Sequence, residues 1–209
     1  VLALALLALF FFWRVTLGGL TLLPADNAFT WEPWRTYAAQ AGVTVPHNGL
    51  LSDLYLENYV WKQFIVECLR SGQLPLWNPA ILCGAPFLAA GQHSALYPFS
   101  VLFYLLPLTA AYGWFAALHV FLAGLNTYLL ARALGLRRSA SGIAALTFEF
   151  CGLIVVSNVF PMIMAAAVWL PLILAAIQLL VRRVAESEPT RGGGAGTLLG
   201  LIPQAVLGV

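Results

Sequence analysis

Charged residues are scarce in this chain. Asp, Glu, Lys and Arg make up 9% of its 209 residues, whereas hydrophobic residues make up 61%. A water-soluble domain carries about a quarter charged residues, so lipid rather than water must solvate most of this sequence. The net charge is only +2 and no basic run is present, which sets nucleic acid aside as a partner. The composition therefore predicts a multi-spanning membrane protein.

The sequence also lacks the motifs of soluble enzymes. It contains no phosphate-binding loop, nucleophile elbow or dinucleotide fingerprint. Its three cysteines, Cys68, Cys83 and Cys151, do not have the spacing of a metal site. Cys68 and Cys83 would be able to pair in an oxidising compartment, but unpaired thiols fit the pattern better. Any chemistry must therefore come from a site of another kind.

Apolar runs divide the chain into segments, because a membrane span needs about 20 apolar residues. Both ends of the chain lie inside such runs, so we expect residues 1–209 to be the N-terminal part of one longer transmembrane domain. A cleaved signal peptide is the alternative for the first run, although the basic residues of such peptides are missing. The expected spans are residues 1–23, 111–134, 140–156 and 161–181, with the start of a further span at 196–209.

An insert over residues 24–97 separates the first two spans and holds most of the acidic residues. Residues 99–110 are short for a span and contain Pro107, so we expect an interfacial helix there that does not cross the membrane. The arginine pairs at 137–138 and 182–183 then lie on the cytoplasmic side, as positively charged loops generally do. If residues 99–110 crossed, both pairs would lie outside. The insert is therefore predicted to be extracytoplasmic.

The middle of the insert has the pattern of a surface helix followed by a stiff loop. Residues 54–71 (LYLENYVWKQFIVECLRS) have apolar residues at helical spacing, with Ser52 or Asp53 suited to cap the start and Gly72 to end the helix. The next residues, 72–98, contain four prolines and three glycines but are largely apolar. They predict an irregular, rigid segment that lies against the helix and the lipid.

Two carboxylates of this helix are the first candidates for chemistry. Asp53 and Glu57 are four residues apart, so they share a helix face, with Trp61 one turn further on. Such a pair near a membrane surface is suited to accept a proton from a hydroxyl or to bind a divalent cation. The alternative is that Asp53 caps the helix and Glu57 interacts with the helix dipole. Asp26 is a further candidate, with a polar stop after the first span as its alternative.

Other polar residues are candidates for substrate binding. Lys62, Arg70 and His93 are suited to bind a phosphate, although a lone loop histidine is more often solvated or packed. Arg14 lies either within the membrane or at its outer interface, where it would reach headgroups or a lipid phosphate. We therefore expect anionic groups to be held near the outer surface.

Polar groups within the spans bear on a second class of function. A transporter places its polar residues near the middle of the membrane. His119 and Glu149 lie within the expected spans, where they are either functional or joined in hydrogen bonds between helices. Because most polar groups lie in the insert instead, the pattern favours surface chemistry over transport.

Five motifs occur in a recognisable order: LLPADNAFTWEPW, PHNGLLSDLYLENYVW, RSGQLPLWNPAILCGAPFLAAGQHSALYP, LHVFLAGLNTYLLARALGLRR and AAAVWLPLILA. Together they resemble the bacterial YfhO family of membrane proteins, over residues 22–181. That family is similar to the GT-C fold glycosyltransferases. The resemblance implies an all-α, multi-spanning helical bundle with a large first extracytoplasmic loop that contains an amphipathic helix.

The resemblance also implies an activity. In GT-C enzymes an acidic residue near the start of the surface helix acts as base or metal-linked catalyst, and Asp53 matches that position best, followed by Asp26. Glu57 stands where the family pattern leads us to expect glutamine. The implied reaction moves a sugar from a polyprenyl-phosphate donor to a glycan or glycolipid acceptor of the cell envelope. The implied location is the bacterial cytoplasmic membrane, with the active face extracytoplasmic.

The remaining site residues follow from the same resemblance. Aromatic rings would stack on sugar faces, polar side chains would hydrogen-bond to the sugar, and cations would hold the lipid phosphate; packing against the surface helix is the alternative for the aromatic rings. A divalent cation is a candidate cofactor, with Asp26 and Asp53 as its ligands. A non-catalytic envelope-assembly scaffold or a lipid-carrier transporter is the alternative function. The candidate substrate-binding residues are Trp77, Asn78, Gln92, His93, Tyr97, Lys62, Arg70 and Arg14.

Overall fold

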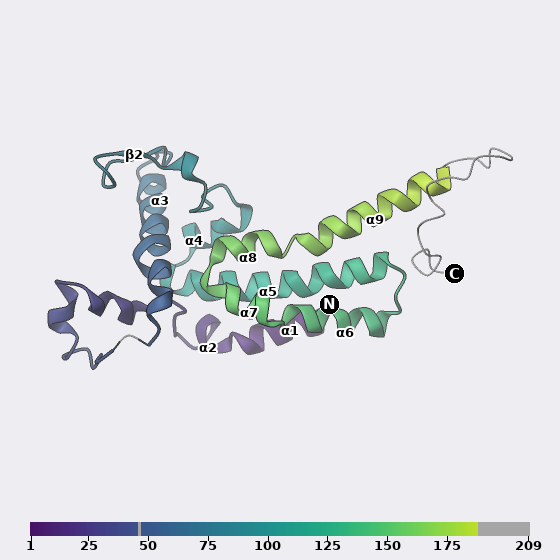
Figure 1. The fold of residues 1–209 in the computed structure, drawn as a ribbon, viewed down its shortest axis with the longest axis horizontal. Coiled ribbons are helices and arrows are strands. Elements are labelled where there is room, and N and C mark those ends of the chain that lie inside the picture. Colours follow the sequence, from purple (N-terminus) through teal and green to yellow (C-terminus); the bar gives the residue numbers. More distant parts are fainter. Residues whose placement is uncertain (46, 188–209) are drawn as a thin grey trace.

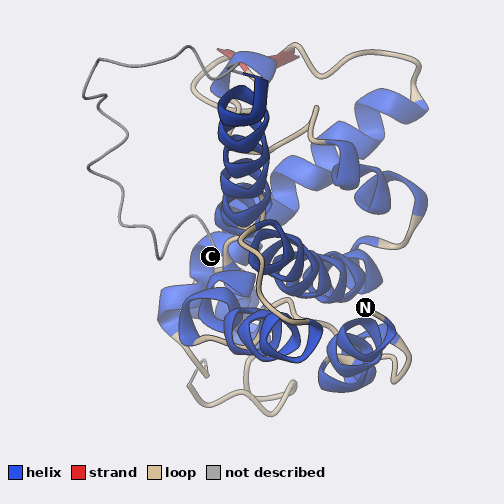
Figure 2. Cartoon of the chain, turned by 90° about the vertical axis from the view of Figure 1, so that its right-hand side faces the viewer, coloured by secondary structure: helices blue, strands red, loops and turns tan. Residues whose placement is uncertain are grey.

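The computed structural model describes residues 1–45 and 47–187, so the span expected at 196–209 lies outside the described residues (Figure 1). The described chain is mostly helical, with two short strands at one edge (Figure 2). Within these residues, three helical stretches are long and apolar enough to cross a membrane, as in an all-α membrane protein. These stretches are Leu108–Ala133, Arg138–Val159 and Pro161–Glu186.

The central helix of the bundle is α5, Leu108–Ala133, which the other spans surround (Figure 1). Small residues on α5 let neighbouring backbones come close. A Cβ atom added at Gly113 would lie 2.6 Å from the carbonyl oxygen of Val15, and one added at Gly124 would lie 2.5 Å from Oε2 of Glu149. Glycine at these two positions therefore allows the close packing of the first helices and of the Glu149 side chain on α5.

The first apolar run is helical over a shorter stretch than the expected 1–23. Helix α1, Leu2–Phe11, continues after a break as α2, Trp13–Thr16. The helix ends before the glycine pair at 18–19, where Gly19 has φ +73°, a left-handed conformation typical of helix ends. The last residues of the run lead into the insert without helical structure.

The other two expected spans are each interrupted by a short break. The segment expected at 140–156 consists of α6, Arg138–Glu149, and α7, Gly152–Val156. The segment expected at 161–181 consists of α8, Pro161–Ala167, and α9, Leu170–Ser187. The turn between α7 and α8 returns the chain to the end of the bundle that carries the insert (Figure 1).

The surface helix of the insert runs across the end of the bundle rather than along it (Figure 1). It begins with a π-helical segment, Leu54–Tyr59, and continues as α3, Val60–Arg70. It ends at Arg70, within one residue of the expected end, and the left-handed Gly72 follows with φ +73°. Because the spans cross the membrane along their own axes, a helix across their ends lies near the membrane surface.

The apolar segment after α3 forms a tight hairpin and then leads back to the bundle. Strand β1, Trp77–Asn78, pairs antiparallel with β2, Ala85–Pro86. Helix α4, Val101–Leu105, is too short to cross a membrane, and it lies where we expect an interfacial helix. All three cysteines are free. Short 3₁₀ turns complete the described chain at Ala25–Thr30, Trp34–Tyr37, Gly49–Leu51, Leu88–Ala90, Pro98–Ser100 and Ser157–Val159.

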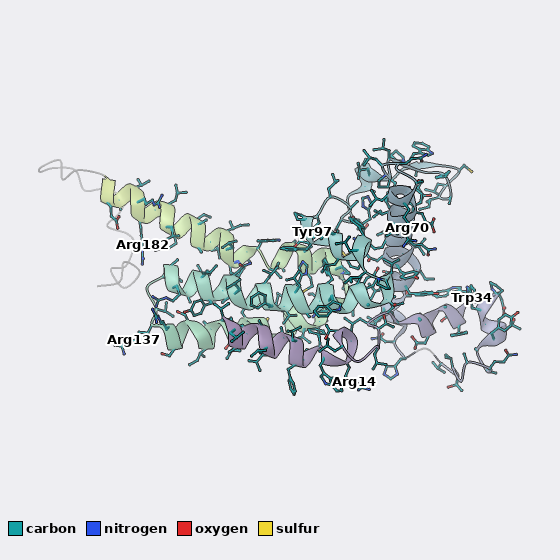
Figure 3. All side chains as sticks on the ribbon, turned by 180° about the vertical axis from the view of Figure 1, so that it is seen from behind. Arg14, Trp34, Arg70, Tyr97, Arg137 and Arg182 are labelled. Atoms are coloured by element: carbon teal, nitrogen blue, oxygen red, sulfur yellow. The ribbon has the colours of Figure 1, made fainter. Side chains whose placement is uncertain are left out.

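The basic loops and the insert lie at opposite ends of the bundle. Arg137 and Arg182 lie at one end, whereas Arg70 and Trp34 lie at the other (Figure 3). The predicted topology requires this separation, because it places the arginine pairs on one side of the membrane and the insert on the other.

Candidate functional site

One row of side chains on the surface helix anchors it to the bundle and to the segment that leads back into the bundle. Asn58, Lys62 and Ile65 are all buried. Asn58 accepts a hydrogen bond of 2.8 Å from the hydroxyl of Tyr112 on α5. This row divides the exposed surface of the helix into two flanks, each of which borders a different cavity.

Lys62 holds the loop of residues 93–103 against the helix. Its Nζ donates to the carbonyl oxygen of His93 at 2.6 Å and to Oγ of Ser100 at 3.3 Å. The ammonium also lies 4.6 Å from the ring centre of Phe103. Burial lowers the pKa of Lys62 from 10.5 to about 7. These contacts use Lys62 for structure rather than for a phosphate.

His93 is a packed histidine with both ring nitrogens engaged. Its Nδ1 accepts a hydrogen bond of 3.1 Å from the backbone N–H of Ala95, so its Nε2 carries the proton and donates to the carbonyl oxygen of Phe87 at 2.7 Å. The ring stacks on Phe87 with ring centres 4.1 Å apart. Burial, followed by the nearby charge of Lys62, lowers the pKa of His93. The structure thus favours the packed alternative for this residue.

Tyr97 joins the loop to the spans through a directed chain of hydrogen bonds. Nδ1 of His119 donates to a backbone carbonyl at 2.7 Å, which leaves its Nε2 to accept from the Tyr97 hydroxyl at 2.8 Å. The same hydroxyl accepts from Nε1 of Trp169 at 3.1 Å. Burial raises the pKa of Tyr97. The ring of Tyr97 is therefore held by the bundle, and Tyr97 also lines a cavity.

Three neighbouring cavities surround residues 91–93. The first, of about 60 Å³, is lined by Asp53, Glu57 and Gln92 together with the turn between α7 and α8. The second, of about 160 Å³, is lined by Asn78 and His93. The third, of about 340 Å³, is lined by His93 and Tyr97. We call the first of these cavities the acidic cleft.

Shared walls connect the three cavities. Trp61 and Gln92 line both the acidic cleft and the second cavity, and Met162 lines both the acidic cleft and the third cavity. The predicted residues Asp53, Glu57, Asn78, Gln92, His93 and Tyr97 are thus brought together around one end of the bundle.

The two carboxylates of the acidic cleft are both exposed. Asp53 makes no capping hydrogen bond, although it stands at the start of the helix. Within the described part of the chain, neither Asp53 nor Glu57 has a hydrogen-bond or ion-pair partner on its carboxylate. The capping alternative for Asp53 is therefore wrong, and both groups remain available to a ligand.

Five predicted residues lie outside the three cavities. Asp26 accepts a hydrogen bond of 2.6 Å from the backbone N–H of His47, which connects the start of the insert to its middle. Arg70 lines a cavity on the opposite flank of α3. Trp77 packs on Gly84, where an added Cβ would lie 2.6 Å from its Nε1. The two others are Lys62, described above, and Arg14, which is exposed on α2.

Two parts of the acidic cleft are not among the residues predicted to bind substrate. One is Trp61, which the sequence indicates only as a neighbour of the two carboxylates. The other is the turn at residues 159–162, which joins two expected spans. The signal for this turn is its place in the chain, since the topology returns it to the same membrane face as the insert. Because residues 159–162 are apolar, their composition gives no indication that they line a binding site.

The donor set of the acidic cleft bears on the predicted cation. Among residues 1–45 and 47–187, no three or more His, Cys, Asp or Glu side chains form a group that would hold a metal ion. Asp26 lines none of the cavities that contain Asp53. The described residues therefore do not form a metal centre of protein ligands alone.

The chain was compared with known proteins at the level of families, sequences and structures. No protein-family model, curated protein or solved structure matches it.

Proposed function

We propose that this protein is a membrane glycosyltransferase that transfers a sugar from a polyprenyl-phosphate donor to an acceptor glycan or glycolipid of the bacterial cell envelope. The observation that carries the proposal is the acidic cleft, in which Asp53 and Glu57 are exposed and without protein partners in the described chain. Carboxylates without partners at a membrane surface are suited to receive a proton from a substrate hydroxyl.

The proposed reaction is a displacement at C1 of the donor sugar. The Asp53 carboxylate accepts the proton of the acceptor hydroxyl, and the hydroxyl oxygen forms a bond to C1. The bond between C1 and the phosphate oxygen breaks, and the lipid phosphate leaves with the electron pair. Glu57 lines the same cleft and offers a second carboxylate to accept a hydrogen bond from the substrate.

The other walls of the cavities have positioning roles in this proposal. Trp61 offers a ring face and Gln92 offers an amide to the sugar, because both line the acidic cleft and the cavity beside it. The apolar turn at 159–162 excludes water from the reacting groups. No step of the proposed mechanism requires a metal ion.

Asp53→Asn in the full-length protein tests the proposal. We expect sugar transfer from a polyprenyl-phosphate donor in isolated membranes to fall by about 100-fold or more, the size typical of losing a general base. The matched control is Glu32→Gln, which alters an exposed carboxylate elsewhere in the insert. Undiminished sugar transfer by Asp53→Asn would contradict the proposal that Asp53 is the general base.

A lipid-carrier transporter is the second candidate, and one observation favours it. Glu149 is fully buried between α6 and α5, and neither of its carboxylate oxygens has a hydrogen-bond partner within the described residues. Ionisable groups buried in spans mark ion or proton pathways in many transporters. Loss of lipid-carrier movement in Glu149→Gln, with normal movement in Asp53→Asn, would favour this candidate.

A further inference from the structure

A further cavity, separate from the three described above, lies on the flank of α3 that faces away from the acidic cleft. Its volume is about 570 Å³, larger than that of any of the three cavities described above. One wall is formed by Gln63, Glu67 and Arg70 of α3, and the other by residues 103–109, which join α4 to α5. We call it the interfacial cavity.

The polar wall of the interfacial cavity carries one negative and one positive charge. Glu67 and Arg70 are three residues apart on α3, so they lie on neighbouring positions of one helix face. Both side chains are exposed. In the described chain they form no ion pair with each other or with another residue. Nε2 of Gln63 donates to Oε1 of Glu67 at 3.1 Å, which orients the carboxylate.

The opposite wall is apolar and lies at the level where a span begins. Leu105 is 77% exposed and is followed by Leu106 and Pro107, directly before the span that starts at Leu108. Tyr59 and Tyr104 also line the cavity, and tyrosine is enriched at membrane–water interfaces. The cavity therefore has polar groups on one wall and mostly apolar groups on the other, where α5 begins.

From this arrangement we propose that the interfacial cavity binds an aminophospholipid, a lipid whose headgroup carries a phosphate and a primary ammonium. Arg70 binds the phosphate with its guanidinium, and Glu67 accepts hydrogen bonds from the ammonium. The acyl chains lie along Leu105 and the start of α5. The site takes a structural lipid, and it is independent of the proposed glycosyl transfer.

The charges of the cavity distinguish this lipid from others. An anionic headgroup with no ammonium would leave Glu67 facing a like charge. A choline headgroup has no N–H group to donate to the carboxylate, so it loses the charge-assisted hydrogen bond. The phosphate is common to all three lipid classes, so Arg70 contributes to binding without selecting among them.

Lipid adducts of the full-length protein test the proposal by native mass spectrometry. The purified protein is given equal amounts of phosphatidylethanolamine, phosphatidylcholine and phosphatidylglycerol with identical acyl chains. We expect about fivefold more of the ethanolamine adduct than of either other adduct, the size of one favourable exposed charge interaction. Equal adducts for all three lipids would overturn the proposal.

Two variants and two matched controls separate the roles of the charges. Glu67→Gln should abolish the preference for ethanolamine over choline, whereas Arg70→Gln should weaken all three adducts together. Glu32→Gln and Arg35→Gln alter an exposed acid and base with the same three-residue spacing outside the cavity, so they should change nothing. An equal change in the controls, or an unchanged preference in folded Glu67→Gln, would contradict the assignment.

Soluble glycerophosphoethanolamine separates a lipid from its headgroup alone. We expect it to leave the phosphatidylethanolamine adduct intact at equal concentration, because it lacks the acyl chains that contact Leu105 and α5. Displacement at equal concentration would overturn the assignment of the site to a membrane lipid.

Discussion

The buried amine of Lys62 makes the stability of the protein depend on pH in a defined direction. Its pKa is about 7 in the folded protein against 10.5 for an exposed lysine. Between these values the unfolded chain binds more protons than the folded chain, so the free energy of unfolding rises with pH. Replacing Lys62, the only lysine in the sequence, with methionine removes this contribution.

The size of the change in stability follows from the lowering of the Lys62 pKa. Between pH 7 and pH 9.5 the titration of Lys62 adds about 3 kcal/mol to the free energy of unfolding. For a chain of this size about 1 kcal/mol changes the melting temperature by about 2–4 °C, so the wild type should gain about 6–12 °C relative to Lys62→Met over this range. Tryptophan fluorescence during heating in a mild detergent measures both proteins at each pH.

The comparison with Lys62→Met isolates this amine from other groups that titrate in the same range. At pH 9.5 the variant should be the less stable protein, because the carbonyl oxygen of His93 and the hydroxyl of Ser100 lose their donor. Its deficit should shrink as the pH falls to 7. Parallel curves for the two proteins between pH 7 and pH 9.5 would refute the account of Lys62 as a buried, desolvated amine.

Two further changes test how the bundle is held together. Tyr97→Phe leaves Nε2 of His119 and Nε1 of Trp169 without their partner, so we expect a loss of about 2 kcal/mol of stability, seen as a lower melting temperature. An unchanged melting temperature would contradict the role of this hydroxyl. Gly113→Ala places a Cβ 2.6 Å from a backbone oxygen of α2, so we expect a loss of about 1–3 kcal/mol of stability. Gly142→Ala within α6, with nothing within 4 Å of its added Cβ, should instead gain up to about 1 kcal/mol from helix propensity; equal melting temperatures for the two variants would refute the close packing at Gly113.

The arrangement of elements follows from patterns that local sequence carries. Long apolar runs predict spans at 111–134, 140–156 and 161–181, because lipid requires such runs wherever a helix crosses it. The structure has its long apolar helical stretches at 108–133, 138–159 and 161–186, close to these bounds. The end of the surface helix just before Gly72 follows from the left-handed conformation that glycine adopts readily. Breaks such as the one between α6 and α7 depend on packing between helices, which a single run does not encode.

The site is predicted less completely, because burial in a loop depends on distant contacts. Lys62 and His93 have polar side chains that predict exposure, yet each is buried by contacts made with the other's segment. A helical projection of α3 places Lys62 beside Ile65 on the buried row and Arg70 on the flank away from Trp61. The positions of these two side chains around the helix are therefore predictable from the sequence. The contribution of residues 159–162 required the folded chain.

The central claim is that the acidic cleft receives the sugar of the lipid-linked donor. Photo-crosslinking tests it most directly, with p-benzoylphenylalanine in place of Gln92 in the cleft and, as the matched control, in place of Gln63 on the other flank of the surface helix. After illumination with a polyprenyl-phosphate sugar, we predict an adduct at position 92 and little at position 63. An adduct at position 63 with none at position 92 would contradict the account.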